Sequence, residues 1–155
     1  MARFMVVDRN KAVLLVLGAL LGVHVLCAIA LGGEPYKLAH WKVKDGDTLE
    51  AETLYLPFGE ALYDVDMRCA DFDAWESSFR RVSVSVTHEE IARGKRAAKD
   101  LAELLNTHEF RVLPPNDSRV RDVYGRLLVV IEVKLPERGW VKLADWMKLH
   151  GHIRK

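Results

Sequence analysis

The sequence predicts a small α+β barrel of five strands and two helices, preceded by an apolar N-terminal segment. Three observations predict this class: short alternating apolar runs separated by turn signals, one long stretch with helical spacing, and an apolar run near the N-terminus. A chain of 155 residues is long enough for one domain with a substantial core. Strands interleaved with helices, without repeats or low-complexity tracts, favour a compact barrel.

Residues 12–31 are apolar apart from His24. At about 1.5 Å per residue, a helix of this length crosses the hydrocarbon core of a bilayer. Three basic residues and one acid precede the run, so the positive-inside rule keeps the N-terminus in the cytoplasm. We therefore expect a single membrane anchor with the folded domain in the periplasm or outside the cell. The basic residues are Arg3, Arg9 and Lys11.

Cleavage of this segment is an alternative, because residues 28–30 have the small-x-small form of a signal-peptidase site and would release the domain near Ala30. The run is longer than the apolar region of most signal peptides, which favours an uncleaved anchor. A Gly-Gly-Glu-Pro linker follows, so we expect two parts, residues 1–33 and 34–155. Cys27 and Cys69 fall in different parts, and no intrachain disulfide is expected.

Five short runs have the composition of strands. Residues 36–43, 48–56 and 62–70 come first, and Asp45-Gly46 is a strong hairpin signal between the first two. Residues 110–113 and 127–133 follow later in the chain. The stretch 77–86 alternates valine with serine after a basic opening, and its interpretation stays open between a strand and a loop.

Two segments have helical signals. Thr87 followed by Glu90 three residues later forms a capping box, and the apolar spacing predicts a helix from there to Asn106. A second helix is expected after Gly139, ended by Gly151.

Charge divides the exported part into two halves. Residues 34–76 hold 11 acidic and 4 basic residues, a net charge of −7, whereas residues 77–155 hold 10 acidic and 16 basic residues, a net charge of +6. The first half suits a cation and the second suits a polyanion. The whole chain is at +1, which argues against a protein that coats nucleic acid with a basic surface throughout.

Four short motifs carry the chemistry. Together they supply hard oxygen ligands, one spare carboxylate and two arginines, which a metal-assisted attack on a phosphodiester requires. They are residues 45–48 (Asp-Gly-Asp-Thr), Arg68, residues 73–76 (Asp-Ala-Trp-Glu) and residues 122–126 (Asp-Val-Tyr-Gly-Arg).

In order and spacing, these motifs resemble the staphylococcal nuclease (thermonuclease) family over about residues 42–151. The resemblance implies an OB-like five-stranded barrel with packed helices. It also implies a calcium site and three catalytic side chains. The implied metal ligands are Asp47, Asp73 and the backbone carbonyl of Ala74, and the implied catalytic residues are Arg68, Glu76 and Arg126.

The residue chemistry agrees with these roles. Calcium takes about 6 to 8 oxygen ligands, so two carboxylates and one carbonyl leave places for water and a phosphate oxygen. Taken alone, Asp47 and Asp73 are ordinary turn or loop acids. Together with Glu76, which is placed to accept a proton from water or to orient it, they indicate a hydrolytic site.

The two arginines suit the transition state. Attack on a phosphodiester adds negative charge to the equatorial oxygens, and a guanidinium holds two of them while staying charged. For both Arg68 and Arg126 the alternative is a surface ion pair. Tyr124 is a candidate substrate-binding residue that donates to a phosphate or stacks on a base, with a turn aromatic as the equal alternative.

Three positions depart from the family pattern, one of them Ala144, where an asparagine is usual. Trp75 stands where most members have proline, and Val123 stands where the best-known member has a lysine that contacts a substrate phosphate. Arg93, Lys95 and their basic neighbours on the first helix either extend a phosphate track or form a solvated face.

The sequence therefore predicts a calcium-dependent hydrolase, an endonuclease acting on DNA with RNA as a further candidate substrate. The resemblance implies products with 3′-phosphate ends. No obligate protein partner is inferred. The alternative is a tethered OB-like module that binds nucleic acid or protein without cutting it, and the joint presence of Glu76 and both arginines favours the enzyme.

Overall fold

The computed structural model describes residues 33–57, 59–78, 86–116 and 119–154. The chain divides into two units between Gly33 and Glu34, and the fold described below belongs to the second unit. The expected anchor at residues 12–31 and most of the ambiguous stretch 77–86 lie outside the described residues. Among the residues that are described, no helix has the length and apolar character needed to span a bilayer.

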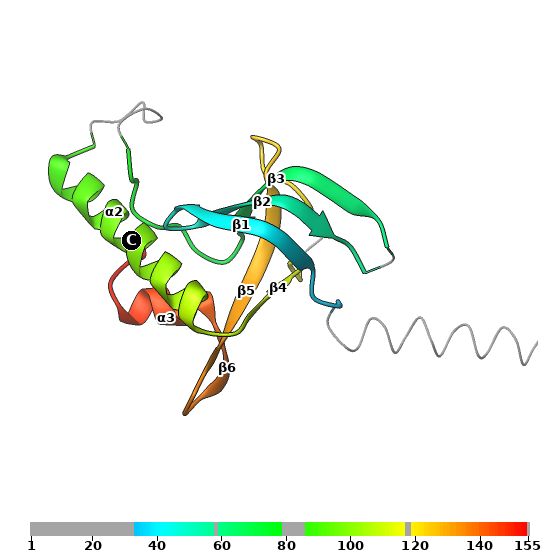
Figure 1. Ribbon diagram of the computed structural model, residues 1–155. Helices are drawn as coiled ribbons and strands as arrows, with labels where there is room; N and C mark the ends of the chain where they lie inside the picture. Colours follow the sequence, from blue (N-terminus) through cyan, green and yellow to red (C-terminus); the bar gives the residue numbers. More distant parts are fainter. Residues whose placement is uncertain (1–32, 58, 79–85, 117–118, 155) are drawn as a thin grey trace, which may run out of the picture. The chain divides into compact units, whose positions relative to one another are not determined.

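One mixed sheet of six strands forms the body of this unit, and it curls strongly (Figure 1). Its order is β1-β2-β3-β5-β4, with β6 paired to β5. The β3 and β5 strands run parallel, and every other pair is antiparallel. The strands are β1 (Lys37–Asp45), β2 (Thr48–Tyr55), β3 (Ala61–Cys69), β4 (Phe110–Leu113), β5 (Leu127–Leu135) and β6 (Gly139–Lys142).

The sheet curls far enough for its two ends to meet. Just before β1, Tyr36 forms an antiparallel bridge with Val112 of β4, and its N–H donates to the Val112 carbonyl at 2.8 Å. Because β1 and β4 are the ends of the strand order, this bridge joins the first strand to the last. The expected α+β class is confirmed as a curled mixed sheet with two helices.

One left-handed residue in β1 and one in β3 bend these two strands. The row Leu38, Leu54 and Leu62 and the row Trp41, Ala51 and Val65 both pack in or against the core. These rows lie three positions apart instead of the two that regular alternation requires. His40 (φ 51°) and Asp64 (φ 50°) lie between them. The left-handed conformation at these positions absorbs the extra residue and bends the strands.

The helix α2 (His88–Thr107) begins at the residue that the sequence predicts. The Thr87 side chain accepts from the Glu90 N–H, and the Glu90 carboxylate accepts from the Thr87 N–H at 2.9 Å, so the capping box is confirmed. Its buried face includes Leu101, Leu104 and Leu105 and packs into the core with the inner faces of the strands.

The C-terminal part differs from the expectation in one respect. The second helix, α3 (Leu143–Leu149), begins later than the pattern after Gly139 predicts, because residues 139–142 form the sixth strand instead. Gly139, at φ 67°, pairs with Leu135 and closes a tight turn that folds β6 back onto β5. This pairing satisfies backbone groups that an early helical turn would leave exposed.

The residues after α3 contact the loop after β3 and the helix α2. Ile153 forms an antiparallel bridge with Ala74, and the Arg154 N–H donates to the Asp73 carbonyl at 2.9 Å. His152 is buried, with its Nε2 3.0 Å from the Asp100 carboxylate of α2. The C-terminal segment therefore ties the loop after β3 to the helix α2.

Candidate functional site

Asp47 lies in the two-residue turn between β1 and β2, at the centre of a polar cluster. The turn packs closely because residue 46 is glycine: a Cβ there would lie 2.6 Å from the Ala74 Cβ and 3.1 Å from the Ala97 Cβ. A side chain at this position would push the turn away from both the loop after β3 and the helix α2. The glycine therefore lets Asp47 sit against the loop, where it is only 5% exposed.

Three kinds of donor hold the Asp47 carboxylate. The Thr48 hydroxyl donates to its Oδ1 at 2.9 Å, and the Ala74 N–H donates to its Oδ2 at 3.2 Å. From β3, Arg68 Nη1 donates to Oδ1 at 3.2 Å, and Arg68 Nη2 lies 3.1 Å from Oδ2. The turn, the loop and the third strand thus meet at one buried acid.

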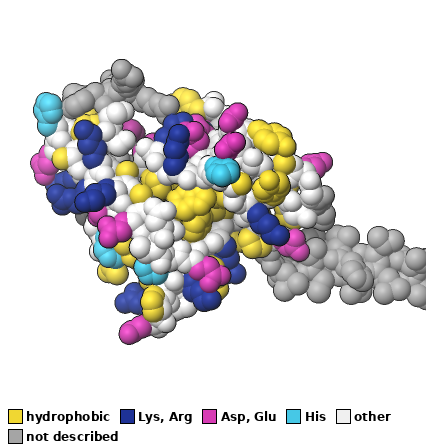
Figure 2. Space-filling view, viewed as in Figure 1, with side chains coloured by type: hydrophobic (Ala, Val, Ile, Leu, Met, Phe, Trp, Pro, Cys, Tyr) yellow, Lys and Arg dark blue, Asp and Glu magenta, His cyan; other side chains and the backbone are white. Residues whose placement is uncertain are grey.

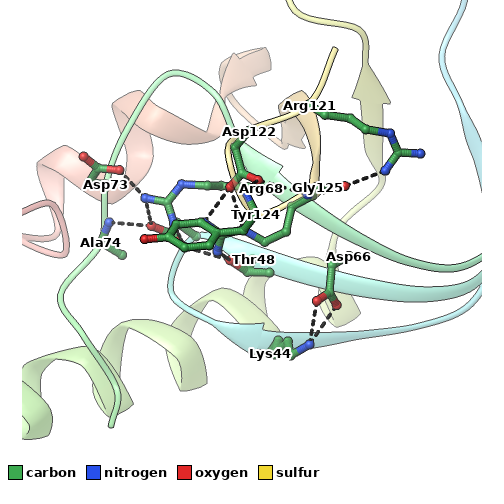
Figure 3. A network of polar contacts seen from close by, with 12 residues as sticks. Lys44, Thr48, Asp66, Arg68, Asp73, Ala74, Arg121, Asp122, Tyr124 and Gly125 are labelled. Atoms are coloured by element: carbon green, nitrogen blue, oxygen red, sulfur yellow. Dashed lines mark hydrogen bonds and ion pairs between the residues drawn. The ribbon is translucent and has the colours of Figure 1, made fainter. Parts of the chain in front are cut away.

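Arg68 bridges the two aspartates that the sequence singles out. Its Nη2 also donates to Oδ1 of Asp73, which points toward the same guanidinium from the loop (Figure 3). The Asp73 side chain is 71% exposed, whereas the Asp47 side chain is 8% exposed. The predicted pair of carboxylates therefore converges, with Arg68 between an inner and an outer acid.

The cluster carries more negative than positive charge. Burial and, to a smaller extent, the neighbouring Asp45 together raise the pKa of Asp47 to about 6, although Arg68 acts to lower it. Burial alone would lower the pKa of Arg68, but the Asp47 and Asp73 carboxylates outweigh it and the net pKa is raised. Three aspartates thus surround one guanidinium, and a buried carboxylate is left incompletely neutralised.

This donor set fits a hard divalent cation. It offers carboxylate oxygens, which suit calcium and magnesium, and its excess negative charge favours an added cation. Within the described residues, no group of three or more His, Cys, Asp or Glu side chains is gathered as a metal site. The predicted set depends on two carboxylates and one carbonyl, so protein atoms would fill only part of the coordination sphere.

The second predicted arginine reaches the same turn from another direction. Arg126, immediately before β5, donates from Nη1 to the Thr48 hydroxyl at 3.4 Å, across 78 residues of sequence. Its other nitrogens, Nε and Nη2, both lie 2.7 Å from Oδ2 of Asp122. Both arginines are ion-paired, but neither pair is a simple surface pair, because Arg126 is 13% and Arg68 is 23% exposed.

Asp122 organises the turn that presents Arg126. Its Oδ1 accepts from the N–H groups of Tyr124 and Arg126, each at 2.9 Å. Although burial opposes it, these bonds and the Arg126 guanidinium lower the pKa of Asp122. The Tyr124 ring projects from the turn, 81% exposed, with the Arg126 guanidinium 5.5 Å from its centroid. Tyr124 is therefore available at the surface beside Arg126.

Glu76 follows the Asp73-Ala74 pair but does not join the hydrogen-bonded cluster. Its backbone carbonyl packs on α2 at Gly94, where an added Cβ would lie 2.1 Å from the Glu76 oxygen. Among the described residues, no hydrogen bond or ion pair connects its carboxylate to the cluster. The absence of a side chain at Gly94 lets this loop approach the helix α2 closely.

Trp75, between Ala74 and Glu76, packs against the helix α2. The Arg93 guanidinium of α2 lies 5.2 Å from its ring centroid. Its Nε1 is buried and has no hydrogen-bond partner among the described groups. A cation–π contact therefore holds the loop against α2.

Two contributors escaped the sequence reasoning. Thr48 is buried and connects Asp47 to Arg126, and Asp122 anchors Arg126 from four residues away. Both belong to motifs that the sequence analysis quotes. The i, i+4 spacing of an acid and an arginine was a local signal for the second pair, whereas the link through Thr48 depends on the tertiary fold.

The basic residues of α2 face solvent. Arg93, Lys95, Arg96 and Lys99 are exposed, and Figure 2 shows basic side chains gathered at the α2 end of the visible face. Arg93 is paired with Glu89 at 2.6 Å. A hollow of about 490 Å³ lies elsewhere, between β1 and β4, and Trp41 and Phe110 line it.

Comparison of the chain with models of known protein families gave no match, and comparison with curated proteins gave no significant match.

Proposed function

We propose that this protein is a calcium-dependent nuclease whose domain at residues 34–155 is an OB-like barrel of the staphylococcal nuclease type. One observation carries the proposal most strongly. Arg68 lies in β3 and Arg126 in the turn before β5, yet they donate to two adjacent residues, Asp47 and Thr48, where the first turn meets β2. Two guanidinium groups and two converging carboxylates within one small cluster are suited to hold a cation and a phosphate together.

The carboxylates would bind the metal. Asp47, Asp73 and the Ala74 carbonyl offer hard oxygen ligands, and the remaining positions would go to water and a phosphate oxygen. When bound, calcium would polarise the phosphate and lower the pKa of a coordinated water. The raised pKa of Asp47 is consistent with this role, because an uncompensated buried carboxylate gains from an added positive charge.

Three protein side chains would assist proton transfer and stabilise the transition state. Glu76, three residues after Asp73, would accept a proton from the attacking water or orient it. Arg68 and Arg126 would hold the equatorial oxygens as negative charge builds on them. Water attacks phosphorus, the bond from phosphorus to the 5′-oxygen breaks, and the 5′-oxygen takes up a proton. The phosphate stays on the 3′-oxygen.

The substrate in this proposal is DNA, with RNA as a further candidate, and Tyr124 contacts it beside Arg126. Residues 12–31 would anchor the enzyme in a membrane with its N-terminus in the cytoplasm, or would be removed near Ala30. In both cases the domain works outside the cytoplasm.

A non-catalytic OB-like binding module remains the second candidate. It is favoured by the present ion pairs, because Arg68 and Arg126 are both occupied by carboxylates. Such a module has no need for Glu76. The two candidates therefore differ most sharply in the consequence of changing this one residue.

The test is cleavage of plasmid and single-stranded DNA by the full-length chain in mild detergent, in calcium or in chelator. We expect cutting only in calcium, and a fall of about 100-fold or more in Glu76→Gln and Arg126→Ala. Glu103→Gln, an exposed glutamate of α2, and Arg138→Ala, an exposed arginine of the β5–β6 turn, are matched controls. Circular dichroism checks the fold of each variant. Metal-independent cutting, or equal cutting by wild type and both site variants, rejects the proposal.

A further inference from the structure

A second surface beside Arg126 has the chemistry of a nucleobase subsite. A hollow of about 280 Å³ lies between the outer side of β3 and the turn that carries Arg126. Tyr63 from the strand and Tyr124 from the turn both line it, together with Arg126 itself. They are 72% and 81% exposed, and two such exposed aromatic rings around one hollow form a surface on which a flat ring can stack.

Tyr63 faces this hollow because of the bend in β3. With regular alternation, Tyr63 would share the inward side of Val65, two residues further along the strand. Asp64, between them, has φ 50°, and Leu62 takes the inward position instead. A left-handed non-glycine residue in a strand is strained, and such strain often accompanies a functional site. Here it turns a large aromatic side chain out of the core and toward the turn at Tyr124.

Of the charged groups around the hollow, Asp66 and Arg126 form ion pairs, and Arg121 is held by a hydrogen bond to a backbone carbonyl. Asp66 binds Lys44 at 2.7 and 2.8 Å, and Arg121 donates to the Gly125 carbonyl at 2.5 Å (Figure 3). Arg126 is paired with Asp122. Asp64 and Asp66 on the strand side would repel a second phosphate. The hollow therefore suits an uncharged flat group that is linked to a phosphate at Arg126.

We propose that Tyr63 and Tyr124 form a stacking subsite for the base next to the phosphate bound by Arg126. This inference rests on the proposed nuclease function and adds a substrate preference to it. A base enters the subsite only when it is unpaired, because stacking between two protein rings requires that it leave the duplex. The enzyme then favours single strands and frayed ends over closed duplex.

Equilibrium binding tests the subsite without cleavage. The probe is a single-stranded oligodeoxynucleotide containing one 2-aminopurine, and the protein is the full-length chain in mild detergent and chelator. The 2-aminopurine fluorescence reports stacking, and fluorescence anisotropy of an end label reports binding. Three variants are compared with wild type: Tyr63→Ala, Tyr63→Phe and Tyr55→Ala. Tyr55 is an exposed tyrosine of β2 outside the hollow, which makes it the matched control.

We expect the wild type to quench the probe on binding. Tyr63→Ala should weaken binding at least about fivefold and remove part of the quenching, since loss of one stacked base has an effect of this size or larger. Tyr63→Phe keeps an aromatic face and should bind as the wild type does, as should Tyr55→Ala. A closed duplex hairpin of the same sequence should bind equally well to wild type and Tyr63→Ala.

Three results overturn the inference, and they differ in what they say about the proposed function. If the wild type cuts DNA in calcium but Tyr63→Ala binds and quenches as the wild type does, the subsite is wrong and the nuclease proposal stands. If the wild type neither binds the oligonucleotide nor cuts DNA, both proposals fail. An equal loss in Tyr63→Ala and Tyr55→Ala also rejects the subsite, because it would reflect a general change in the sheet.

Discussion

The molecule holds two arginine–aspartate pairs within one cluster, and they differ in charge balance. Around Arg68, the acids Asp47 and Asp73 share one guanidinium, and the pKa of the inner acid is raised to about 6. Around Arg126, a single acid, Asp122, receives the guanidinium and two N–H groups, and its pKa is lowered. The arginine–aspartate cluster at Arg68 therefore has an excess of negative charge, whereas the charges of the Asp122–Arg126 pair are balanced.

The difference separates a cluster that would bind a metal from a pair that would contact the phosphate without binding the metal. A buried acid with incomplete compensation gains from an added cation, whereas a neutral, fully hydrogen-bonded pair has little to gain. The Arg68 cluster is thus the part that a metal and a phosphate would rearrange. The Asp122–Arg126 pair instead holds the turn and presents the remaining nitrogen of Arg126 toward Thr48.

Removal of either guanidinium should have the largest effect. Arg68→Ala and Arg126→Ala should each lower kcat for DNA cleavage by about 100- to 1,000-fold, because each removes a charge that stabilises the transition state. The two should differ in calcium affinity: Arg68→Ala keeps or strengthens it, since the competing cation is gone, and Arg126→Ala leaves it unchanged. Steady-state kinetics with isothermal titration of calcium measures both. Calcium affinity lost in Arg68→Ala would contradict the assignment of the acids as ligands.

Replacing the aspartate of each pair by asparagine should affect calcium binding in one pair only. Asp47→Asn should weaken calcium binding at least about tenfold, because it removes a charged ligand from the inner position. Asp122→Asn should bind calcium as the wild type does. Isothermal titration at pH 7 decides the matter, and equal losses in the two variants would show that the pairs do not differ in the way described.

Asp122→Asn, which should leave calcium affinity unchanged, should lower the stability of the fold. Asp122→Asn should lower the free energy of unfolding by about 1–3 kcal/mol at pH 7, because it weakens a partly buried charged network. The folded pKa of Asp122 is lowered, so its contribution is present above its unfolded pKa and is lost as the pH falls toward the folded one. Urea unfolding of wild type and variant between pH 3 and pH 7 measures this. A difference that grows as the pH falls would be the wrong sign.

The pH dependence of Asp47 should have the reverse sign. Its pKa is raised from 3.8 to about 6, so between these values the folded chain keeps a proton that the unfolded chain has released. In chelator, this group should therefore lower stability by about 2–3 kcal/mol as the pH rises from 4 to 6. Asp47→Asn, which cannot titrate, should lack this decline. If the free energies of unfolding of the two proteins change in parallel between pH 4 and pH 6, Asp47 is not a buried acid with a raised pKa.

Local signals predicted most of the fold. The Asp45-Gly46 hairpin and the Thr87–Glu90 capping box depend on neighbouring residues, and both are confirmed. The strand β6 was missed because a four-residue segment with one inward apolar residue is too short to stand out from the helix that follows. Its formation depends on pairing with β5, which the local sequence does not specify.

Tertiary contacts account for what remained unpredicted in the site. Local spacing could indicate the pairing of Asp122 with Arg126, but the sharing of Arg68 between Asp47 and Asp73 requires the turn, the strand and the loop to meet. The outward position of Tyr63 depends on the left-handed Asp64, and asparagine or glycine would have been the usual signal for that conformation. The motifs identified the residues, and the fold determined their partners.

The most direct test of the central claim is a calcium titration followed through the arginine Nε–H signals in NMR spectra of the full-length protein. The account predicts a saturable shift of the Arg68 signal while the Arg126 signal keeps its position, and loss of the Arg68 shift in Asp47→Asn. An Arg68 signal unmoved by millimolar calcium, or one that moves equally in Asp47→Asn, would contradict the claim that the Arg68 cluster is the metal site.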